Sequence, residues 1–334
     1  MSVTPPMKNK HRIGRSLCLE NPRPKGGISP LRQGCLLIFT LNQNNIPIRH
    51  LLDDTVFQTF IVFVEYLTPS TPLPSHRLVF NAIGDADLEG PALVAAESLI
   101  ARTTTRVINL PSAVAVTGRS DNAKRLADIT GVVTPGTLVV PREQIAGLTF
   151  PLLVRSPGFH SGRYFVKVEA PEDLPEALKG LPGDELAVMS CLDARGADGK
   201  FRKYRVMMIG GQLYPLHAAI SHDWKVHYFT ADMANNPGHR AEDQTFLENM
   251  PEVLGPEAMQ SLTEIEKRLG LDYAGIDFGL SSDGEILLFE ANATMVVNPP
   301  EPDEKWAYRR PAVERIFTAV RNMLGDASTG ALVG

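Results

Sequence analysis

The stretch GIDFGLSSDGEILLFEANAT, from Gly275 to Thr294, places acidic side chains in segments that are otherwise apolar. Asp277 lies in the first apolar run, and Glu290 and Asn292 end the second run, after the turn SSDG. Removing an isolated charge from water is costly, so buried carboxylates are rarely kept without a partner. These acids are therefore either paired with basic side chains or ligands of a cation.

The two apolar runs predict a β-hairpin with its turn near Ser282 and Asp283. Folding back there sets Asp277 opposite Glu290, at the ~5 Å spacing of cross-strand neighbours. Glu290 and Asn292 are two residues apart, so their side chains share a face. Neither strand carries a basic residue, so three oxygen donors would converge in a set that suits Mg²⁺, with Mn²⁺ as an alternative. The other interpretation is a pair of solvated edge carboxylates, which the apolar neighbours disfavour.

The chain has 334 residues, of which 43% are hydrophobic and 21% are charged, a composition typical of globular proteins with two or three domains. The three cysteines, Cys18, Cys35 and Cys191, are far apart, so neither a disulfide framework nor a cysteine zinc site is indicated. A cytoplasmic location is expected. No apolar run approaches the ~20 residues of a membrane span, so no membrane contact is expected.

Residues 1–34 contain seven Lys or Arg residues and one acid, Glu20. A basic tail of this kind can contact nucleic acid. Its Pro and Gly residues and its low apolar content instead favour a disordered, solvated tail, with no specific nucleic-acid binding.

Residues 35–130 predict a parallel α/β domain, because strands and helices alternate along this part of the chain. The expected strands begin at Cys35, Thr59, Arg77 and Thr105, and the expected helices cover 91–103 and 120–129. Ligands gather beyond the carboxyl ends of parallel strands, where Asn81, Gly84 and Asp85 follow the third strand. A plain turn is the alternative for these three residues.

The pattern becomes antiparallel after Pro135. Strands are expected at 150–157, 163–169, 185–196, 203–211 and 212–221, followed by a helix at 255–271, the hairpin and a helix at 305–324. A phosphate-binding GxxxxGK[ST] loop is absent, which argues against an ordinary P-loop NTPase. His217, His222 and His227 do not have the HExxH spacing, so a zinc site is disfavoured.

The hairpin resembles the C-terminal metal-binding hairpin of the ATP-grasp superfamily, which includes glutathione synthetases, D-alanine–D-alanine ligases and RimK-like ligases. Its pattern is an Asp on one strand, a DG turn and Glu-x-Asn on the next, and Asp277, Glu290 and Asn292 match the three Mg²⁺ ligands. The resemblance implies that a pre-ATP-grasp domain, a small lid subdomain and a large subdomain enclose ATP. After the tail at 1–34, these units correspond to residues 35–130, 131–190 and 191–334.

The stretch FPLLVRSPGFHSGRYFVKV resembles the strand, glycine-rich loop and strand that cover the ATP phosphates in this superfamily. Arg155 stands where members usually carry a Lys that touches phosphate. The matching loop residues are Gly158, His160, Ser161 and Gly162.

Further cofactor contacts are implied by position. Lys124 matches a phosphate-binding Lys before the linker, with Arg119 as a second candidate. The segment ELAVMSCLD resembles the strand whose backbone binds adenine, at Met189 and Cys191, and whose following acid binds ribose. That acid would be Asp193 or, alternatively, Asp184.

The strand KYRVMMIGG resembles the one that carries an Arg to the transferred phosphate, so Arg205 matches this position and Arg202 is the reserve. Arg205 and Arg155 are thus the expected catalytic residues. Dipeptide ligases of the superfamily carry an Arg two residues before the first metal ligand, where this chain has Gly275. That departure weighs against a D-alanine–D-alanine type of reaction.

The resemblance implies an ADP-forming ligase that uses ATP and Mg²⁺ to join a carboxylate to an amine through an acylphosphate. The expected partners are small-molecule or peptide carboxylates and amines, and a homodimer is an assembly that it allows. The alternative is a nucleotide-binding regulatory module that keeps the fold without ligation.

Overall fold

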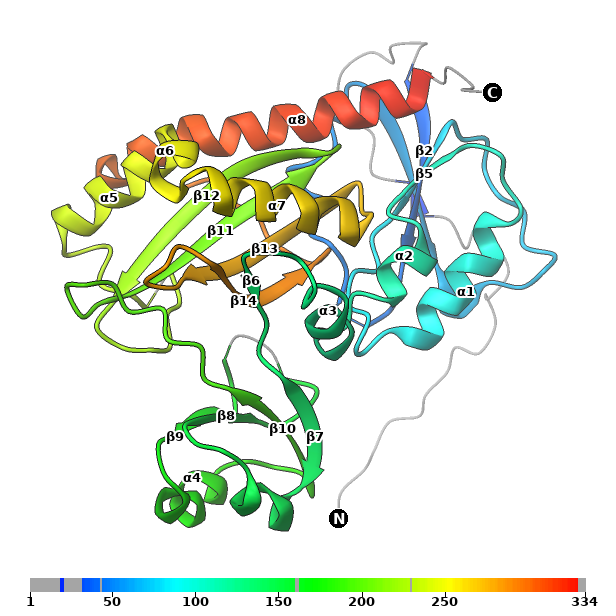
Figure 1. Ribbon diagram of the computed structural model, residues 1–334. Coiled ribbons are helices and arrows are strands. Elements are labelled where there is room, and N and C mark those ends of the chain that lie inside the picture. The colour runs from blue at the N-terminus through cyan, green and yellow to red at the C-terminus, as the bar shows by residue number, and fades with distance from the viewer. Residues whose placement is uncertain (1–18, 21–31, 43, 160–161, 229, 330–334) are drawn as a thin grey trace, which may run out of the picture.

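The described residues form three β-sheets, shown in the computed structural model of Figure 1. The structure describes residues 19–20, 32–42, 44–159, 162–228 and 230–329. We call the sheets the N-terminal sheet, the small sheet and the large sheet. Among the described helices, none has an apolar stretch long enough to cross a membrane.

The N-terminal sheet is the predicted parallel α/β unit. Its central strand β2 (Gln33–Phe39) pairs in parallel with β3 (Phe57–Phe63) and β4 (Leu78–Asn81), and β4 pairs in parallel with β5 (Arg106–Ile108). The helices of this region are α1 (Gly90–Ile100), α2 (Pro111–Ala115) and α3 (Arg119–Arg125). A short 3₁₀-helix, η1 (Val64–Tyr66), follows β3.

The predicted tail is wrong at two places. Leu19 and Glu20 form β1 (Leu19–Glu20), which pairs antiparallel with β3, and β2 begins at Gln33. The outer edge of β3 presents unpaired backbone groups, and a short strand can satisfy them whatever its net charge. Residues 1–18 and 21–31 of the predicted tail lie outside the described residues.

The small sheet is antiparallel, in the order β7-β10-β8-β9. Its strands are β7 (Thr137–Pro141), β8 (Leu152–Arg155), β9 (Phe165–Val168) and β10 (Glu185–Ser190), and its helices are η2 (Arg142–Gly147), η3 (Pro171–Asp173) and α4 (Leu174–Lys179). Ile145, Val154 and Leu186 are fully buried in a core of its own. The small sheet therefore packs as a separate unit below the large sheet (Figure 1).

The large sheet has the order β12-β11-β13-β14-β6. Its strands are β6 (Val132–Val133), β11 (Phe201–Ile209), β12 (Gln212–Ser221), β13 (Tyr273–Leu280) and β14 (Ile286–Asn292). Before the small sheet, Val132–Val133 pairs with β14 of the large sheet, and β7 then joins the small sheet.

Helices cover one face of the large sheet (Figure 1). They are α5 (Pro237–Glu248), α6 (Met250–Leu254), α7 (Pro256–Leu269) and α8 (Arg310–Thr329), the last preceded by η4 (Glu304–Arg309). On this face Tyr204 stacks on Phe278, with ring centroids 5.5 Å apart, and Tyr204 also contacts Phe246 of α5. Because strand side chains alternate, neighbouring positions such as Arg205 and Asp277 point to the opposite face.

Asn109 joins the N-terminal unit to the large sheet. It is fully buried and has a positive φ of 55°. Its Nδ2 donates to Tyr273 O at 2.9 Å, its Oδ1 accepts from Tyr273 N at 2.9 Å, and its own N–H donates to Asp272 Oδ2 at 3.0 Å. These bonds fix the start of β13, and so the position of Asp277 relative to the N-terminal unit.

Replacing Asn109 tests this connection. Asn109→Ala removes both side-chain bonds to Tyr273 and keeps the unfavourable φ, so we expect a loss of about 2–4 kcal/mol in the free energy of unfolding. Asn109→Gly also removes the bonds but relieves the backbone, and should be less damaging by about 1 kcal/mol. Urea denaturation measures both. Losses below about 0.5 kcal/mol in both variants, the range of ordinary surface changes, would contradict the assignment.

Candidate functional site

A row of polar side chains crosses four strands of the large sheet. Glu290 on β14 lies opposite Asp277 on β13, Asp277 lies opposite Arg205 on β11, and Arg205 lies opposite His217 on β12. Directly paired residues point to the same face, so the four side chains lie on the face not covered by helices. The predicted opposition of Asp277 and Glu290 is confirmed.

Asp277 is buried and paired with two cations. Its side chain is 5% exposed. Arg205 Nε donates to Oδ1 at 2.5 Å and Arg205 Nη2 to Oδ2 at 2.7 Å, while Lys203 Nζ lies 3.0 Å from Oδ2. Burial alone would raise the pKa of Asp277, but Arg205 and Lys203 outweigh it and hold the pKa well below its usual range. The hairpin itself supplies no basic partner, as expected, but β11 supplies both.

Lys203 was not among the predicted site residues. It lies two positions before Arg205 on one strand, so strand alternation puts both on the same face. The period-two pattern of Lys and Arg in KYR is the signal that could have identified it.

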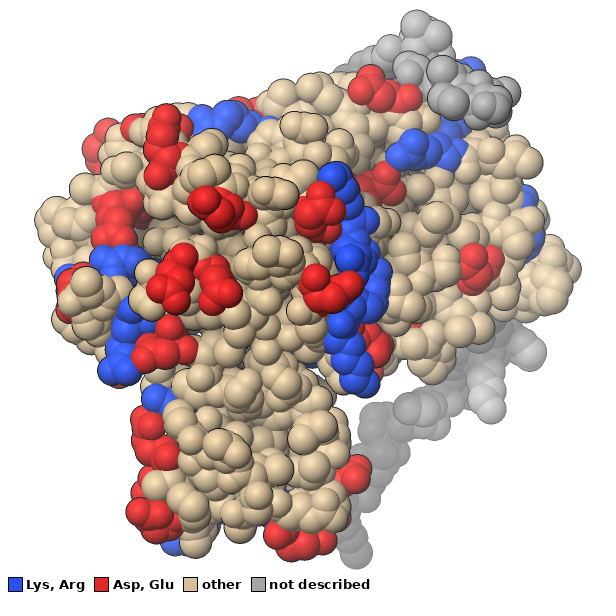
Figure 2. Space-filling view, viewed as in Figure 1, with Lys and Arg blue, Asp and Glu red and all other residues tan. Residues whose placement is uncertain are grey.

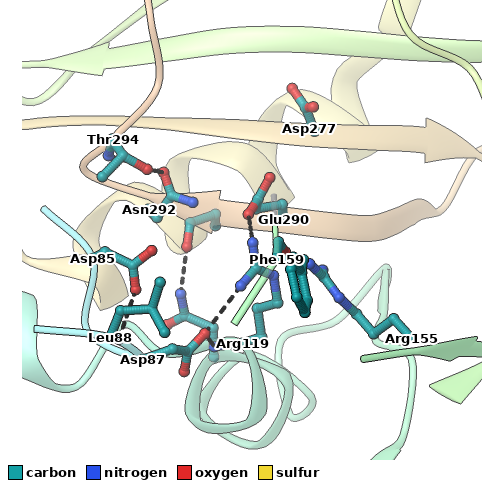
Figure 3. A network of polar contacts seen from close by, with 12 residues as sticks. Asp85, Asp87, Leu88, Arg119, Arg155, Phe159, Asp277, Glu290, Asn292 and Thr294 are labelled. Carbon is teal, nitrogen blue, oxygen red and sulfur yellow. Dashed lines mark hydrogen bonds and ion pairs between the residues drawn. The ribbon is translucent and has the colours of Figure 1, made fainter. Parts of the chain in front are cut away.

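Glu290 is paired with Arg119 of α3. Arg119 Nη2 lies 2.5 Å from Glu290 Oε1, and Arg119 Nη1 lies 3.2 Å from Asp87 Oδ2 (Figure 3). Burial alone would lower the pKa of Arg119, but Glu290 and Asp87 raise it above its usual value. The arginine therefore stays charged between two carboxylates.

Lys124, the first candidate on α3, lies elsewhere. It is exposed and belongs to the last turn of the helix, whereas Arg119 begins the helix. Lys and Arg side chains gather in a band over α3 and the end of α7, where the last turns carry Lys124, Arg125, Lys267 and Arg268 (Figure 2). Cations in these last turns also favour the helix dipoles, which gives Lys124 a structural role without a ligand.

The loop after β4 approaches the end of the hairpin. A Cβ added at Gly84 would lie 2.7 Å from Thr294 Cγ2, so only glycine allows this approach without a shift. Thr294 in turn donates from its N and Oγ1 to Asn292 Oδ1, both at 2.9 Å (Figure 3). Asp85, whose Oδ1 accepts from Leu88 N at 3.0 Å, shares this loop with Asp87. The loop predicted to end the third strand thus reaches the hairpin.

Arg155 and the glycine-rich loop lie at the end of β8 that faces this site. Arg155 donates to Phe159 O, and its guanidinium carbon is 5.7 Å from the centroid of the Phe165 ring. Burial lowers the pKa of Arg155, and the positive charge of Arg119 lowers it further. Gly158 and Gly162 both have positive φ, 81° and 69°, as a tight loop requires. His160 and Ser161 lie outside the described residues.

A cavity of about 30 Å³ lies where three parts of the chain meet. Its lining comes from α3, from the linker and small sheet, and from β14: Arg119, Asn122, Ala123, Pro135, Thr137, Met189, Leu288, Phe289, Glu290 and Ala291. The structure therefore brings together Met189, Arg119 and Glu290, which were assigned separately to adenine, phosphate and metal. The volume leaves room for little more than ordered water.

The remaining nucleotide candidates differ in position. Cys191 follows β10 next to this cavity and is half-buried, and burial raises the pKa of its thiol. Asp193 is paired with Arg195 at 2.5 Å and is about half-exposed. Asp184 is exposed and precedes β10, at the opposite end from Met189, so Asp193 is the nearer of the two ribose candidates.

Arg202, the reserve for Arg205, lies outside the row. It pairs with Asp198 at 2.8 Å and with Glu242 of α5, on the helix-covered side. The alternation of β11 places Arg205, and not Arg202, beside Asp277.

The donors of the predicted metal site fit a hard cation in type and in strand register. Asp277 and Glu290 offer carboxylate oxygens and Asn292 an amide oxygen. Each carboxylate has a cationic partner in the metal-free chain, so a divalent ion would exchange with at least one of these ion pairs. Among the described residues, no group of three or more His, Cys, Asp or Glu side chains could hold a metal ion.

The comparison with solved structures identifies the fold. The D-alanine–D-alanine ligase of Bacillus anthracis, in complex with ATP, aligns with a TM-score of 0.53 and 13% identity over 89% of this chain and 97% of its own. A RimK domain ATP-grasp protein from Sphaerobacter thermophilus has a TM-score of 0.51 and 17% identity, over 89% and 100% of the two chains.

A RiPP-associated ATP-grasp ligase of Chryseobacterium gregarium, in complex with ADP and a leader and core peptide, has a TM-score of 0.51 and 15% identity over 88% of this chain and 97% of its own. No protein-family model matches the chain, and no curated protein does. The chain has the ATP-grasp fold, as its hairpin predicts.

Gly275 has no room for a side chain. A Cβ there would lie 2.6 Å from Met295 Cγ and 3.0 Å from Met207 Sδ. Met295 is held in place because its carbonyl accepts from Tyr273 Oη at 2.8 Å. The missing arginine of dipeptide ligases is thus replaced by a packed methionine.

The two hairpin acids should differ sharply in their contribution to stability. Asp277→Asn leaves Arg205 and Lys203 as uncompensated buried cations, so we expect a loss of about 3–5 kcal/mol without ligand. Glu290→Gln breaks a partly exposed pair and should cost about 1 kcal/mol or less. Urea denaturation at pH 7 measures both, and Lys203→Met should partly rescue Asp277→Asn. Equal losses of unfolding free energy in the two variants would contradict the assignment of Asp277 as the buried partner of Arg205 and Lys203.

The same pair predicts a pH dependence. The folded-state pKa of Asp277 is depressed. Its stabilisation is therefore fully present above the unfolded-state pKa of about 3.9 and is lost as the pH falls below it. The stability difference between the wild type and Asp277→Asn should stay constant above that pH and narrow below it. A gap that widens on acidification would contradict the ion pair.

Proposed function

We propose that the protein is an ADP-forming ligase that joins a carboxylate to an amine through an acylphosphate. The observation that carries this proposal is the convergence of Arg119, Met189 and Glu290 on one cavity beside the polar row. The ATP-grasp fold supports it, because the similar solved structures include ligases in complex with ATP or ADP.

The nucleotide would lie between the small sheet, acting as a lid, and β14. Met189 would contact adenine from the wall of the cavity, with Leu288 and Phe289 also lining it. The backbone of Cys191, just beyond the end of β10, would bind the edge of the base. Asp193 would accept from the ribose once it exchanges its bond to Arg195. The phosphates would extend toward Arg119 and Arg155, both positively charged and near each other.

Phosphoryl transfer depends mainly on positioning and on charge compensation. Arg205, Arg155 and Arg119 would orient the phosphates through bidentate hydrogen bonds. Asp277, Glu290 and Asn292 would hold Mg²⁺, or Mn²⁺, which when bound offsets charge on the phosphates. The loop at Gly158–Gly162 would cover them and exclude water.

The bonds balance in two steps. A carboxylate oxygen bonds to the γ-phosphorus while the bond to ADP breaks. The amine nitrogen then attacks the acyl carbon, phosphate leaves with the electron pair of the C–O bond, and the nitrogen gives up a proton. The packed Met295 beside Gly275 argues against the D-alanine–D-alanine form of this reaction.

Two measurements test the proposal without knowledge of the amine. ATP with Mg²⁺ should raise the melting temperature, since a ligand that binds only the native state stabilises it. Hydroxylamine should replace the amine, so that the right acid gives a hydroxamate and ADP in equal amounts. A melting shift without hydroxamate from any acid in a broad panel would favour a nucleotide-binding regulatory module. Absence of both in folded protein would contradict nucleotide use.

The two basic candidates on α3 should give opposite results. Arg119→Met removes a charged phosphate contact and should weaken ATP binding roughly ten- to a hundred-fold. Lys124→Met, on the same helix but exposed, should change it little. Titration with Mg–ATP, followed by melting temperature, compares the variants. The reverse order would restore Lys124 as the phosphate ligand.

A Glu290→Gln variant tests the metal assignment. It keeps the size of the side chain but removes a negative charge, so hydroxamate formation should fall by orders of magnitude while the fold remains. The stabilisation by Mg–ATP, relative to ATP with EDTA, should also decrease. If wild type and variant gain equally from Mg²⁺, Glu290 is not a ligand.

A further inference from the structure

Two buried polar atoms at the far end of the row have no partner. His217 Nε2 and Arg309 Nε are buried and make no hydrogen bond to any residue that the structure describes. His217 is 6% exposed. Native proteins rarely leave such groups unsatisfied, because the loss of hydration is not regained. The proposed phosphate contacts, Arg205, Arg155 and Arg119, do not use these two atoms.

The Tyr228 ring connects the two groups. Its centroid lies 4.6 Å from that of His217, and the guanidinium carbon of Arg309 lies 4.2 Å from the Tyr228 centroid. The segment after β12 therefore holds the tyrosine against both side chains. Arg309, from η4, therefore lies on the same tyrosine ring that contacts His217, the last member of the row.

Asp243 lies close enough to Arg309 for their charges to attract, but among the described residues no ion pair joins them. Its carboxylate accepts from Ala218 N at 2.7 Å, from Tyr308 Oη at 2.7 Å and from Tyr228 Oη at 3.0 Å. These three donors occupy the buried carboxylate, and no ion pair joins it to Arg309 among the described residues. Arg309 thus has a stacking partner but no counter-ion in direct contact.

The charge balance at this end of the sheet is positive. Lys203 and Arg205 share the carboxylate of Asp277. Arg309, with Asp243 nearby, adds a third cation, so three cations face two carboxylates. Burial lowers the pKa of His217 well below its usual value, and Arg205 lowers it further, so the imidazole is neutral at pH 7. A neutral imidazole can still donate a hydrogen bond. Two donors and an excess of positive charge are complementary to an anion with two oxygens.

We propose that His217 and Arg309 bind a second, unreactive carboxylate of the acid substrate, which makes the substrate a short dicarboxylic acid. This inference rests on the proposed ligase function, since it assumes that the other carboxylate is phosphorylated near Arg205 and Asp277. Adjacent strands lie about 4.8 Å apart, so His217 is about 5–10 Å along the row from these residues. Such a separation suits two carboxylates at the ends of a short carbon chain.

Matched pairs of acids test the proposal by binding. The probes are malonate, succinate, glutarate and adipate, each compared with its monoamide, which keeps the shape and removes one charge. Thermal melts of the full chain with Mg–ADP measure affinity without turnover. At least one diacid should bind roughly ten- to a hundred-fold more tightly than its monoamide, as expected for a hydrogen-bonded charge. No preference at any chain length would overturn the proposal.

Arg309 has a matched control in its neighbour. Arg309→Gln should abolish the preference for the diacid, and Arg309→Lys should retain part of it. Arg310→Gln should leave it intact, because Arg310 is exposed and bonds to Pro302 O. A preference unchanged in Arg309→Gln would overturn the assignment. The preference of the wild-type protein for a diacid over its monoamide tests the proposal even if a variant fails to fold.

The hydroxamate assay separates this inference from the function on which it rests. Hydroxamate formed from monoacids as readily as from diacids would leave the ligase intact and remove the second carboxylate. Selective binding of amino acids, with no diacid preferred, would indicate that His217 and Arg309 bind the carboxylate of the amine substrate. That result would overturn the proposal. Diacid-selective hydroxamate formation would support both.

Discussion

The buried pairing of Asp277 with Arg205 and Lys203 is the interaction on which the site depends. It joins β11 to β13 on the face that carries the row, and it raises the pKa of Arg205, which burial alone would lower. A buried ion pair is weak support for stability, since apolar residues of similar volume often do as well. The ion pair is better explained by the proposed binding function. It holds the cationic donors of Arg205 and Lys203 beside the Asp277 carboxylate, where they could bind an anionic ligand.

The hairpin could be read from sequence because its determinants are local. A turn, two apolar runs and the period of two suffice to set Asp277 opposite Glu290. The basic partners of these acids could not be predicted in this way, because they are distant in sequence. Arg205 lies 72 residues from Asp277, and Arg119 lies 171 residues from Glu290. Only the order of strands in the sheet and the docking of α3 bring them close. The absence of basic residues from the hairpin therefore did not show that its acids are unpaired.

Two features of the structure differ from the sequence analysis for physical reasons: the basic residue of α3 that contacts Glu290, and the helix α5. Lys124 and Arg119 lie on the same helix, but helical phase and position decide which one reaches Glu290, and the chain spacing to the linker does not contain that information. The helix α5 was missed, although Asn236 caps it by accepting from Gly238 N and His239 N and Pro237 begins it. An Asn-Pro start is a recognisable helix signal. The polar composition of the segment concealed it.

The cavity is too small for the nucleotide proposed to bind there, and the small sheet beside it contacts the segment after β12. A volume of about 30 Å³ between Met189 and Glu290 does not admit a nucleotide. Lys225, on the segment after β12, donates to Gly162 O and, at 3.1 Å, to Phe165 O, while Trp224 contacts the Phe165 ring at 5.3 Å between centroids. That segment also carries Tyr228, which covers His217. A single stretch of chain therefore contacts both the small sheet and His217, the residue at the β12 end of the polar row.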